Sequence, residues 1–368
     1  MFFRIEYLNL INLEWLTFNI LLSFILKERG HRHKVAEMKI WYDACTGKHI
    51  RYGVAIARRL RTLGYEVILT TRKHPDTLPL AEFLNEKPIV VGEYAPDSKF
   101  ARLKESTKRQ LLFCKMFEKN PPDIAIMHVS IECARVAFGL GIPLISTFDT
   151  PHAEAQCRLT VPLTDTIIAS KAIPPQTVYR YGAKKIVQFE GVDEVAWIKD
   201  FKPKMKFDFE SPFIVVRETE VKAAYTEGIS DVTEQIAIKL SSLANVVFLT
   251  RYDRKPKKGL VVPETFVDSV SIVAQAGLVV SVGGTMAREA ALQGTPSIVV
   301  PILGWGYVND YVSRKGFPLF NVKPSDVLKN AKKHLGRRVN VSQMLSKLEN
   351  PVDVIEKIIN GKPTIRKN

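Results

Sequence analysis

The stretch 278-LVVSVGGTMAREAALQGTP-296 predicts a strand, a turn and a helix in direct succession. The apolar, β-branched run 278–282 is typical of a buried strand. Residues 285–293 are rich in helix formers, and Gly294 and Pro296 mark the end of that helix. A strand that leads straight into a helix is the repeating unit of a parallel α/β sheet. This stretch therefore indicates the fold class.

The turn between that strand and that helix is a candidate anion site. Gly283 and Gly284 carry no Cβ, so an anion can approach the backbone closely. The first amides and the dipole of the helix that begins at Thr285 favour negative charge, and a phosphate group is expected there. Glu289, one helical turn further on, is placed to accept hydrogen bonds from sugar hydroxyls. The plainer alternative is that the two glycines only make a tight connection.

Composition places the chain among ordinary globular proteins. Its 368 residues suffice for two domains, and 46% hydrophobic with 25% charged residues exclude a disordered chain. The net charge of +15 favours anionic partners such as nucleotide diphosphates, acidic lipids or nucleic acid, although a solvated basic surface explains it equally well. The four cysteines form no C-x-x-C pair and no zinc spacing, so we expect no disulfide framework, no structural metal and a cytoplasmic location.

Residues 1–37 differ from the rest of the chain. An apolar run at 8–26 is followed by a basic run at 27–34, which is the reverse of the order in a secretory signal. Three interpretations stay open: an over-extended start, a membrane-associated amphipathic helix, or an accessory core helix. Met38 opens a strand that would naturally begin a domain.

From Met38 onward, short apolar runs alternate with helical patterns, which predicts parallel sheets with helices packed on them. In the first half we expect strands at 39–42, 66–70, 88–91, 123–127, 143–147 and 165–169, and helices at 51–63, 98–119 and 131–139. In the second half we expect strands at 213–217, 245–250, 260–262, 278–282 and 297–300, and helices at 229–243, 265–275, 285–293, 324–335 and 341–360.

The predicted architecture is α/β, with two Rossmann-like, doubly wound parallel-sheet domains that face a cleft. We expect an extension at 1–37 and a carboxyl-terminal helix with a basic tail at 336–368. Between them we expect an acceptor-side domain at 38–190 and a nucleotide-sugar domain at 212–335. A linker at 191–211, within the irregular segment 182–211, should join the two domains. Ligands of such sheets bind beyond the carboxyl ends of the strands.

Titratable side chains gather at these predicted strand ends. Thr46-Gly47-Lys48-His49 follows the first strand, and a second loop crowds Asp149, His152 and Glu154 into six residues. These groups can move protons near neutral pH, so His49, Asp149, His152 and Glu154 are the candidate catalytic residues. The structural alternative for the second loop is that Asp149 or Thr150 only caps a helix near Pro151.

The candidate nucleotide-binding residues lie on the other domain. Arg217 ends the strand 213–217, so it should emerge on the same rim as the glycine turn. The set is Arg217, Gly283, Gly284, Thr285 and Glu289. Together the two sets suggest chemistry at the sugar carbon of a nucleotide sugar, with the leaving diphosphate stabilised by the helix start and Arg217. The chain has no Asp-x-Asp pair at a strand end, so neither a metal nor another cofactor is expected.

Residues 38 to about 335 resemble a largely archaeal family catalogued as domain of unknown function 354. The resemblance is carried by the segments MKIWYDACTGKH, ARVAFGLGIPLISTFDTPHAEA, PFIVVRE and VVSVGGTMAREAALQGTPS. It implies the GT-B fold of the MurG-type glycosyltransferases and of the non-hydrolysing UDP-N-acetylglucosamine 2-epimerases.

The resemblance also implies roles for single residues. Thr46-Gly47-Lys48-His49 is similar to the Thr-Gly-Gly-His loop of the MurG type, which implies an acceptor-side or catalytic role for His49. A glycine-rich turn followed by a glutamate binds phosphates and ribose in those enzymes, and Gly283, Gly284 and Glu289 match it. Two departures are Ala44-Cys45, where the transferases have two glycines, and Glu218, where the family usually has proline.

The sequence therefore favours a metal-independent glycosyltransferase that uses a nucleotide-diphosphate sugar. The alternatives are a nucleotide-sugar 2-epimerase and a non-catalytic binder of nucleotide or RNA. The expected partners are a nucleotide sugar, an unidentified acceptor for which a lipid-linked molecule is one option, and a peripheral contact with the inner face of the membrane; nucleic acid is disfavoured.

Overall fold

The computed structural model describes residues 38–221, 231–251, 253–302 and 306–361. The extension at 1–37 and the basic tail from Lys362 lie outside these residues. The described residues after Met38 form one compact unit. Among the residues that the structure describes, none of the helices has the length and apolar character needed to span a bilayer.

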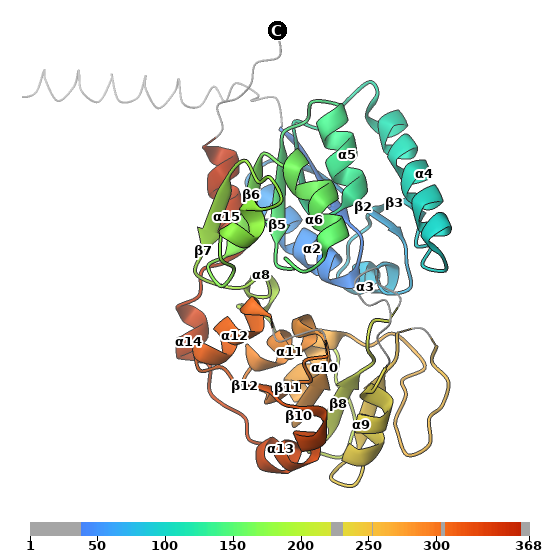
Figure 1. Cartoon of the computed structure of the whole chain (residues 1–368), viewed down its shortest axis with the longest axis vertical. Helices are drawn as coiled ribbons and strands as arrows, with labels where there is room; N and C mark the ends of the chain where they lie inside the picture. Colours follow the sequence, from blue (N-terminus) through green and yellow to red (C-terminus); the bar gives the residue numbers. More distant parts are fainter. Residues whose placement is uncertain (1–37, 222–230, 252, 303–305, 362–368) are drawn as a thin grey trace, which may run out of the picture. The chain divides into compact units, whose positions relative to one another are not determined.

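The first half of the chain forms a parallel sheet of seven strands in the order β3-β2-β1-β4-β5-β6-β7 (Figure 1). The strands are β1 Lys39–Ala44, β2 Glu66–Lys73, β3 Ile89–Glu93, β4 Ile124–His128, β5 Leu144–Phe148, β6 Thr166–Ser170 and β7 Ile186–Phe189. The helices are α2 Gly47–Thr62, α3 Leu78–Phe83, α4 Lys99–Phe117, α5 Ile131–Gly139, α6 Glu154–Thr160, α7 Gln176–Tyr179 and α8 Val195–Ile198, with a 3-10 turn at Val161–Leu163. The strand order reverses direction between β1 and β4, which is where such sheets open a binding crevice.

The second half forms a parallel sheet of five strands in the order β12-β11-β10-β8-β9. The strands are β8 Ile214–Arg217, β9 Val246–Leu249, β10 Leu278–Ser281, β11 Ser297–Val299 and β12 Leu319–Asn321. The helices are α9 Thr233–Leu240, α10 Ser269–Gln275, α11 Gly284–Ala291, α12 Tyr307–Arg314, α13 Val327–His334, α14 Ser342–Ser346 and α15 Pro351–Asn360, with a 3-10 turn at Pro324–Asp326. The prediction of two parallel α/β sheets is confirmed.

Three local predictions differ from the structure. The strand expected at 260–262 is a single bridge between Val247 and Val261, because Pro263 ends the extended run almost at once. The helix expected at 341–360 is two helices, since Asn350 caps a new helix that starts at Pro351. The irregular segment 182–211 contains β7 and the one-turn helix α8, both too short for a clear periodic signal.

The carboxyl-terminal helix returns to the first half of the chain. Helix α15 packs against α2, α8 and β6, where Val352, Ile355 and Ile359 are buried. Arg59 of α2 forms ion pairs with Asp353 and Glu356 of α15 at 2.9 and 2.7 Å. The two halves also share apolar contacts around α8, α11 and α12.

A buried ion pair fixes α4 on the first sheet close to the crevice. Asp43 at the end of β1 is inaccessible to solvent, and its two oxygens accept hydrogen bonds from Arg109 at 2.9 and 2.5 Å. Ser130 and Thr70 donate to the same carboxylate. Burial opposes the charge, but Arg109 and these donors hold the pKa of Asp43 below its usual value. The bidentate geometry is the strong form of such a pair.

We expect Asp43→Asn to lower the free energy of unfolding by about 3 kcal/mol or more, because it leaves the Arg109 guanidinium buried with a weakened partner set. Urea denaturation at neutral pH measures the loss. The double variant Asp43→Asn/Arg109→Met removes both charges and should recover part of it. A loss below about 1 kcal/mol, or no recovery in the double variant, would show that the pair is dispensable.

Candidate functional site

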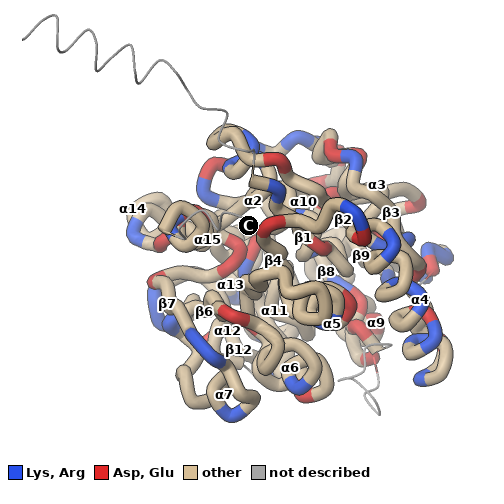
Figure 2. Tube along the Cα trace, turned by 90° about the horizontal axis from the view of Figure 1, so that it is seen from above, with Lys and Arg blue, Asp and Glu red and all other residues tan. Residues whose placement is uncertain are grey.

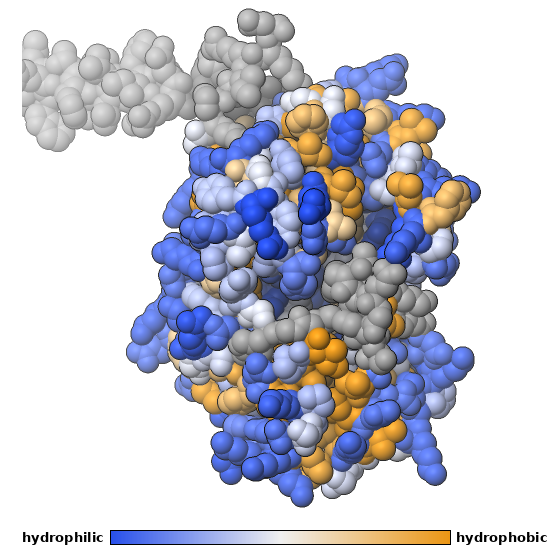
Figure 3. Space-filling model, in the orientation of Figure 1, coloured by the Kyte–Doolittle hydropathy of each residue, from blue (hydrophilic) through white to orange (hydrophobic). Residues whose placement is uncertain are grey.

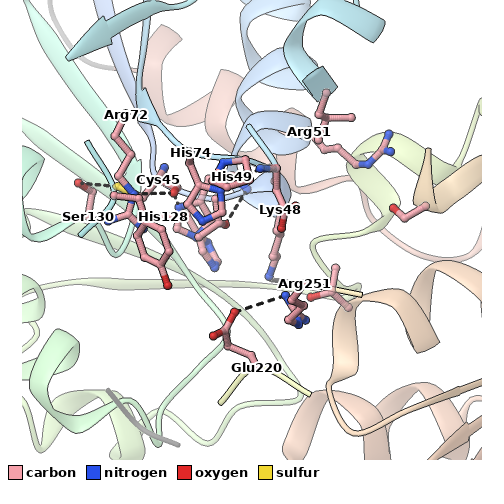
Figure 4. A pocket seen from close by; sticks show the side chains of 18 of the residues that line it. Cys45, Lys48, His49, Arg51, Arg72, His74, His128, Ser130, Glu220 and Arg251 are labelled. Atoms are coloured by element: carbon pink, nitrogen blue, oxygen red, sulfur yellow. Dashed lines mark hydrogen bonds and ion pairs between the residues drawn. The ribbon is translucent and has the colours of Figure 1, made fainter. Parts of the chain in front are cut away.

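A cavity of about 610 Å³ opens at the carboxyl ends of the strands of both sheets (Figure 4). The first half contributes the turns after β1, β4 and β5 and part of α4. The second half contributes the ends of β8 and β9 and the start of α11. The volume lies within the range of roughly 300–1,000 Å³ that is typical of sites for small ligands.

His49 lies in the first turn of α2 and lines this cavity. Its Nδ1 accepts a hydrogen bond from the Cys45 amide at 3.3 Å, and its ring centroid is 4.8 Å from that of His128. Burial, followed by the charges of His128 and Lys48, lowers the pKa of His49 well below its usual value. The imidazole is therefore neutral near pH 7, which is the form that can accept a proton from a substrate hydroxyl. In this tautomer the lone pair is on Nδ1, so a substrate hydroxyl would have to take the place of the Cys45 amide there before it passes its proton to His49.

Lys48 and Asp149 form the centre of an ionic network. Lys48 Nζ lies 2.5 Å from Asp149 Oδ2 and 2.9 Å from Asp193 Oδ2. Burial opposes both charges, yet their attraction raises the pKa of Lys48 and holds the pKa of Asp149 well below its usual value. His128 Nε2 lies 3.1 Å from the other oxygen of Asp149. Asp149 is thus a fully engaged anion, better suited to position Lys48 and His128 than to take up a proton.

Arg288 connects this network to the second half of the chain. Its Nη2 lies 2.7 Å from Glu194 and 3.3 Å from Asp149, and its Nη1 donates to Asn309 at 2.9 Å. A Cβ on Gly284 would lie 2.1 Å from Arg288 Nη1. Gly284 was expected to make room for an anion, but its missing Cβ makes room for this guanidinium.

The start of α11 carries no side-chain cap. Gly283 precedes the helix in an extended conformation, and neither a capping hydrogen bond nor an acidic side chain occupies the first turn. A Cβ on Gly283 would meet open space. Thr285, Met286 and Glu289 of this helix line the cavity. The backbone amides at this helix start are therefore oriented to receive a negatively charged ligand.

Glu289 is buried on the cavity-facing side of α11. Trp197 Nε1 and Ser269 Oγ each donate to one of its oxygens at 3.0 Å, and Arg51 Nε lies 3.8 Å away. Burial raises the pKa of Glu289 to about 7 against the opposing charge of Arg51. Each oxygen keeps a second lone pair, so the carboxylate can still accept from a ligand hydroxyl.

Arg217 emerges at the end of β8, as expected, and lines the cavity. It donates to the Thr250 carbonyl at 2.9 Å and lies 3.5 Å from Asp76 of the first half. Burial and the nearby charge of Arg251 lower its pKa to about 10, so the group stays charged at pH 7. In the same region, Arg251 pairs with Glu220 at 3.5 Å (Figure 4).

Arg72 is a cavity-lining cation that the sequence analysis did not single out. Its Nε donates to the Cys45 carbonyl at 3.0 Å, and its guanidinium carbon lies 4.7 Å over the Tyr94 ring. Among the described residues, no carboxylate forms an ion pair with Arg72. Its remaining N–H groups are therefore available to an anionic ligand.

The other two candidates in the crowded loop lie away from the cavity lining. His152 is exposed, and Glu154 is exposed and pairs with Arg158 at 2.6 Å. Helix α6 begins at Glu154 with Ala153 before it, and no side chain caps it. Asp149 is thus not a helix cap, contrary to the structural alternative, and it joins the network around Lys48.

In the part of the chain that the structure describes, two groups of side chains could offer ligand atoms to a metal ion: Asp43 with Cys45 and Glu132, and His128 with Asp149 and Asp193. In both groups, the carboxylates already contact a positively charged side chain of this protein. Arg109 contacts both carboxylates of the first group, and Lys48 contacts both carboxylates of the second. A metal ion would have to displace these side chains.

Several residues of the site escaped sequence reasoning. His128 ends β4 and is followed closely by Ser130, so the strand-end criterion that found His49 applies to it as well. Asp193 and Glu194 lie in the segment taken for a linker, where the sequence offers no periodic signal. Their pairing with Lys48 and Arg288 joins positions 145 and 94 residues apart.

Comparison with known proteins gives the family. A family profile described as "Protein of unknown function (DUF354)" matches residues 38–362. The chain belongs to this family. It is also 28% identical over 344 residues to the uncharacterised protein MJ0665 of Methanocaldococcus jannaschii, an alignment that covers 88% of this chain and 98% of that protein.

Solved structures similar to the chain include UDP-GlcNAc 2-epimerases and a glycosyltransferase. The UDP-GlcNAc 2-epimerase of M. jannaschii, in complex with UDP-GlcNAc and UDP, aligns with a TM-score of 0.67 at 16% identity, over 88% of this chain and 100% of that one. A putative epimerase from Listeria monocytogenes gives 0.64 at 14%, over 89% and 96%. The spinosyn forosaminyltransferase SpnP gives 0.57 at 13%, over 88% and 99%. At these identities the likeness shows the fold, which is the expected GT-B type.

The raised pKa of Glu289 predicts a pH-dependent stability. Between pH 4.5, its usual pKa, and about pH 7, the folded protein keeps a proton that the unfolded chain has lost. Stability therefore falls as the pH rises through this window, and the loss is complete above it. Glu289→Gln removes the ionisation, and its amide can still bond to Trp197 and Ser269. We expect this variant to be about 2–4 kcal/mol more stable than the wild type at pH 8.

Urea denaturation of both proteins from pH 4 to pH 8 tests this expectation. The difference in unfolding free energy should shrink to nearly zero towards pH 4. A difference that is constant with pH would show that Glu289 does not titrate in this window.

Proposed function

We propose that this protein is an enzyme that binds a nucleotide-diphosphate sugar and transfers the sugar to an acceptor. One observation carries the proposal: a single cavity is lined both by the uncapped start of α11 and by a neutral histidine, His49, on the opposite half. The first supplies electrostatic stabilisation of a leaving diphosphate, and the second supplies a base for the incoming hydroxyl.

The donor would occupy the side of the cavity formed by the second half. Its diphosphate would contact the amides at Gly284 and Thr285, with Arg217 and the unpaired N–H groups of Arg72 as further positive charges. Glu289 would accept from the ribose hydroxyls while Trp197 and Ser269 hold it in place. These fixed cations and dipoles stabilise charge on the leaving diphosphate, so the proposed reaction requires no metal ion.

The acceptor would enter from the first half, next to His49. In the proposed step, the acceptor oxygen attacks the anomeric carbon, its proton passes to His49, and the bond to the diphosphate oxygen breaks. Asp149 would act through Lys48 and His128, which it positions. His152 and Glu154 have no part in this step.

Epimerisation of the nucleotide sugar is a second candidate. It is favoured by the pKa of about 7 for Glu289, because the cavity then holds a second group able to exchange protons near neutral pH. Such a reaction needs no acceptor.

A thermal-shift screen against nucleoside diphosphates and nucleotide sugars tests the proposal first. A ligand that binds only the folded protein raises the melting temperature, by an amount that grows with its concentration. If no uridine, guanosine, thymidine or cytidine diphosphate sugar shifts the melting temperature, the proposal fails. For a donor that binds, proton NMR without acceptor separates the reactions: a new epimer identifies an epimerase, and release of nucleotide only after an acceptor is added identifies a transferase.

Gly283 offers a direct test of the diphosphate seat. Gly283→Asp fits open space, supplies the missing helix cap and places a negative charge where the phosphate would lie. We expect unchanged or slightly raised thermal stability with nucleotide affinity at least about tenfold weaker. Gly283→Asn is the matched control, because it caps the helix without adding charge and should bind more tightly than the aspartate variant. Equal affinities for the two variants would place the phosphate elsewhere.

His49→Gln should leave donor affinity unchanged and lower turnover by roughly 10²–10⁴-fold, because it removes the proton acceptor. Calorimetry measures the affinity, and NMR of the products measures turnover. His74→Gln is the matched control: His74 also lines the cavity, its pKa is lowered to about 4 by burial and by Arg72, and it has no role in the proposed step. Wild-type turnover in the His49 variant would remove this residue from the mechanism.

A further inference from the structure

Helix α4 presents apolar side chains on its solvent face. Phe100, Leu103 and Leu111 are 75%, 67% and 57% exposed, more than any other large hydrophobic residue of the described chain. Their spacing places them on one side of the helix, while Arg109, Phe113 and Phe117 on the other side are buried against the sheet. The helix is therefore apolar on two opposite faces, of which only one packs on the protein.

Lysines run along the same exposed face. Lys104, Lys108 and Lys115 are exposed and follow the helical spacing beside the apolar side chains. Lys108 also lies 3.5 Å from Glu105, a weak surface pair. Figure 2 shows basic residues along α4, and Figure 3 shows hydrophobic patches bordered by hydrophilic surface over the part of the molecule where α4 lies.

The combination of lysines and exposed apolar side chains on α4 fits a lipid surface better than a protein partner. Protein interfaces are depleted in lysine, whereas helices that lie in the plane of a membrane combine lysines with a few large apolar side chains. The apolar side chains enter the boundary between headgroups and acyl chains, and the ammonium groups contact anionic headgroups.

The solvent face of α4, defined by Phe100, Leu103, Leu111, Lys104, Lys108 and Lys115, is named the α4 face here. We propose that the α4 face binds the surface of an anionic lipid bilayer. The opposite side of the same helix reaches the candidate site, because Arg102, Ser106 and Arg109 line the cavity. A bilayer on the α4 face would be separated from these lining residues by the width of one helix, roughly 10 Å. If the proposed function holds, this placement favours an acceptor substrate that is held in the membrane.

Co-sedimentation of the full chain with vesicles tests the proposal without any need for enzyme activity. The probes are vesicles of phosphatidylcholine alone and of phosphatidylcholine with phosphatidylglycerol. We expect binding to the anionic vesicles that weakens with added salt, because the lysine contribution is screened. The charge variant Lys104→Gln/Lys108→Gln/Lys115→Gln and the apolar variant Phe100→Ser/Leu103→Ser/Leu111→Ser should each bind at least about tenfold more weakly.

Matched controls separate the α4 face from general basicity and from residues 1–37, which are the same in every variant. Lys329→Gln/Lys332→Gln/Lys333→Gln removes three lysines from α13, and Leu159→Ser/Ile238→Ser/Val339→Ser removes three exposed apolar side chains from other elements. Both controls should bind like the wild type. All variants change exposed residues, so wild-type melting temperatures are expected and confirm folding.

The proposal is overturned if the α4 variants sediment with anionic vesicles as the wild type does, or if the wild type does not bind vesicles. A change from dimer to monomer in the apolar variant, with no vesicle binding by the wild type, would instead assign the α4 face to a second copy of the chain. Nucleotide binding in the thermal-shift screen is independent of these results, so the two proposals can fail separately.

Discussion

The ammonium group of Lys48, held between Asp149 and Asp193, is the contact on which the arrangement of the site depends. These three charges come from the first turn of α2, the residue after β5 and the segment before α8. Burial of any one of these charges alone would cost free energy, because the charge loses its hydration. The pairing with opposite charges compensates for that loss. Arg288 adds a fourth charge from the other half of the chain. The geometry of the cavity is thus set by ion pairs rather than by apolar packing alone.

This network also distinguishes positioning groups from reactive ones. Asp149 and Lys48 are locked in their charged states, because each stabilises the charge of the other. His49, His74 and Glu289 are among the lining groups whose pKa values move towards or below neutrality, and burial is the main cause for all three. Perturbed titration within a cavity is typical of functional sites, which is why the proposed step is assigned to His49 rather than to the more acidic residues beside it.

The fold was largely predictable from the sequence, because buried parallel strands appear as short β-branched runs and the helices between them are long enough to show their period. The turn at Gly283 and the position of Arg217 followed from the same logic. The ion pairs did not, since they join residues that are 101 and 145 positions apart. Gly284 was selected to leave room for an anion, but its missing Cβ makes room for the Arg288 guanidinium, and Glu154 was selected because crowding along the chain was taken for crowding in space.

The return of α15 to the first sheet means that the first half is not a continuous piece of chain. Its α2 surface is completed by residues that are synthesised after the whole second sheet. A ribosome-bound chain that ends before residue 351 would expose the apolar face of α2 and α8 that α15 covers. Folding of the first half is therefore coupled to synthesis of the chain through α15, and cleavage near residue 350 would unmask the half that lies furthest from the cut in sequence.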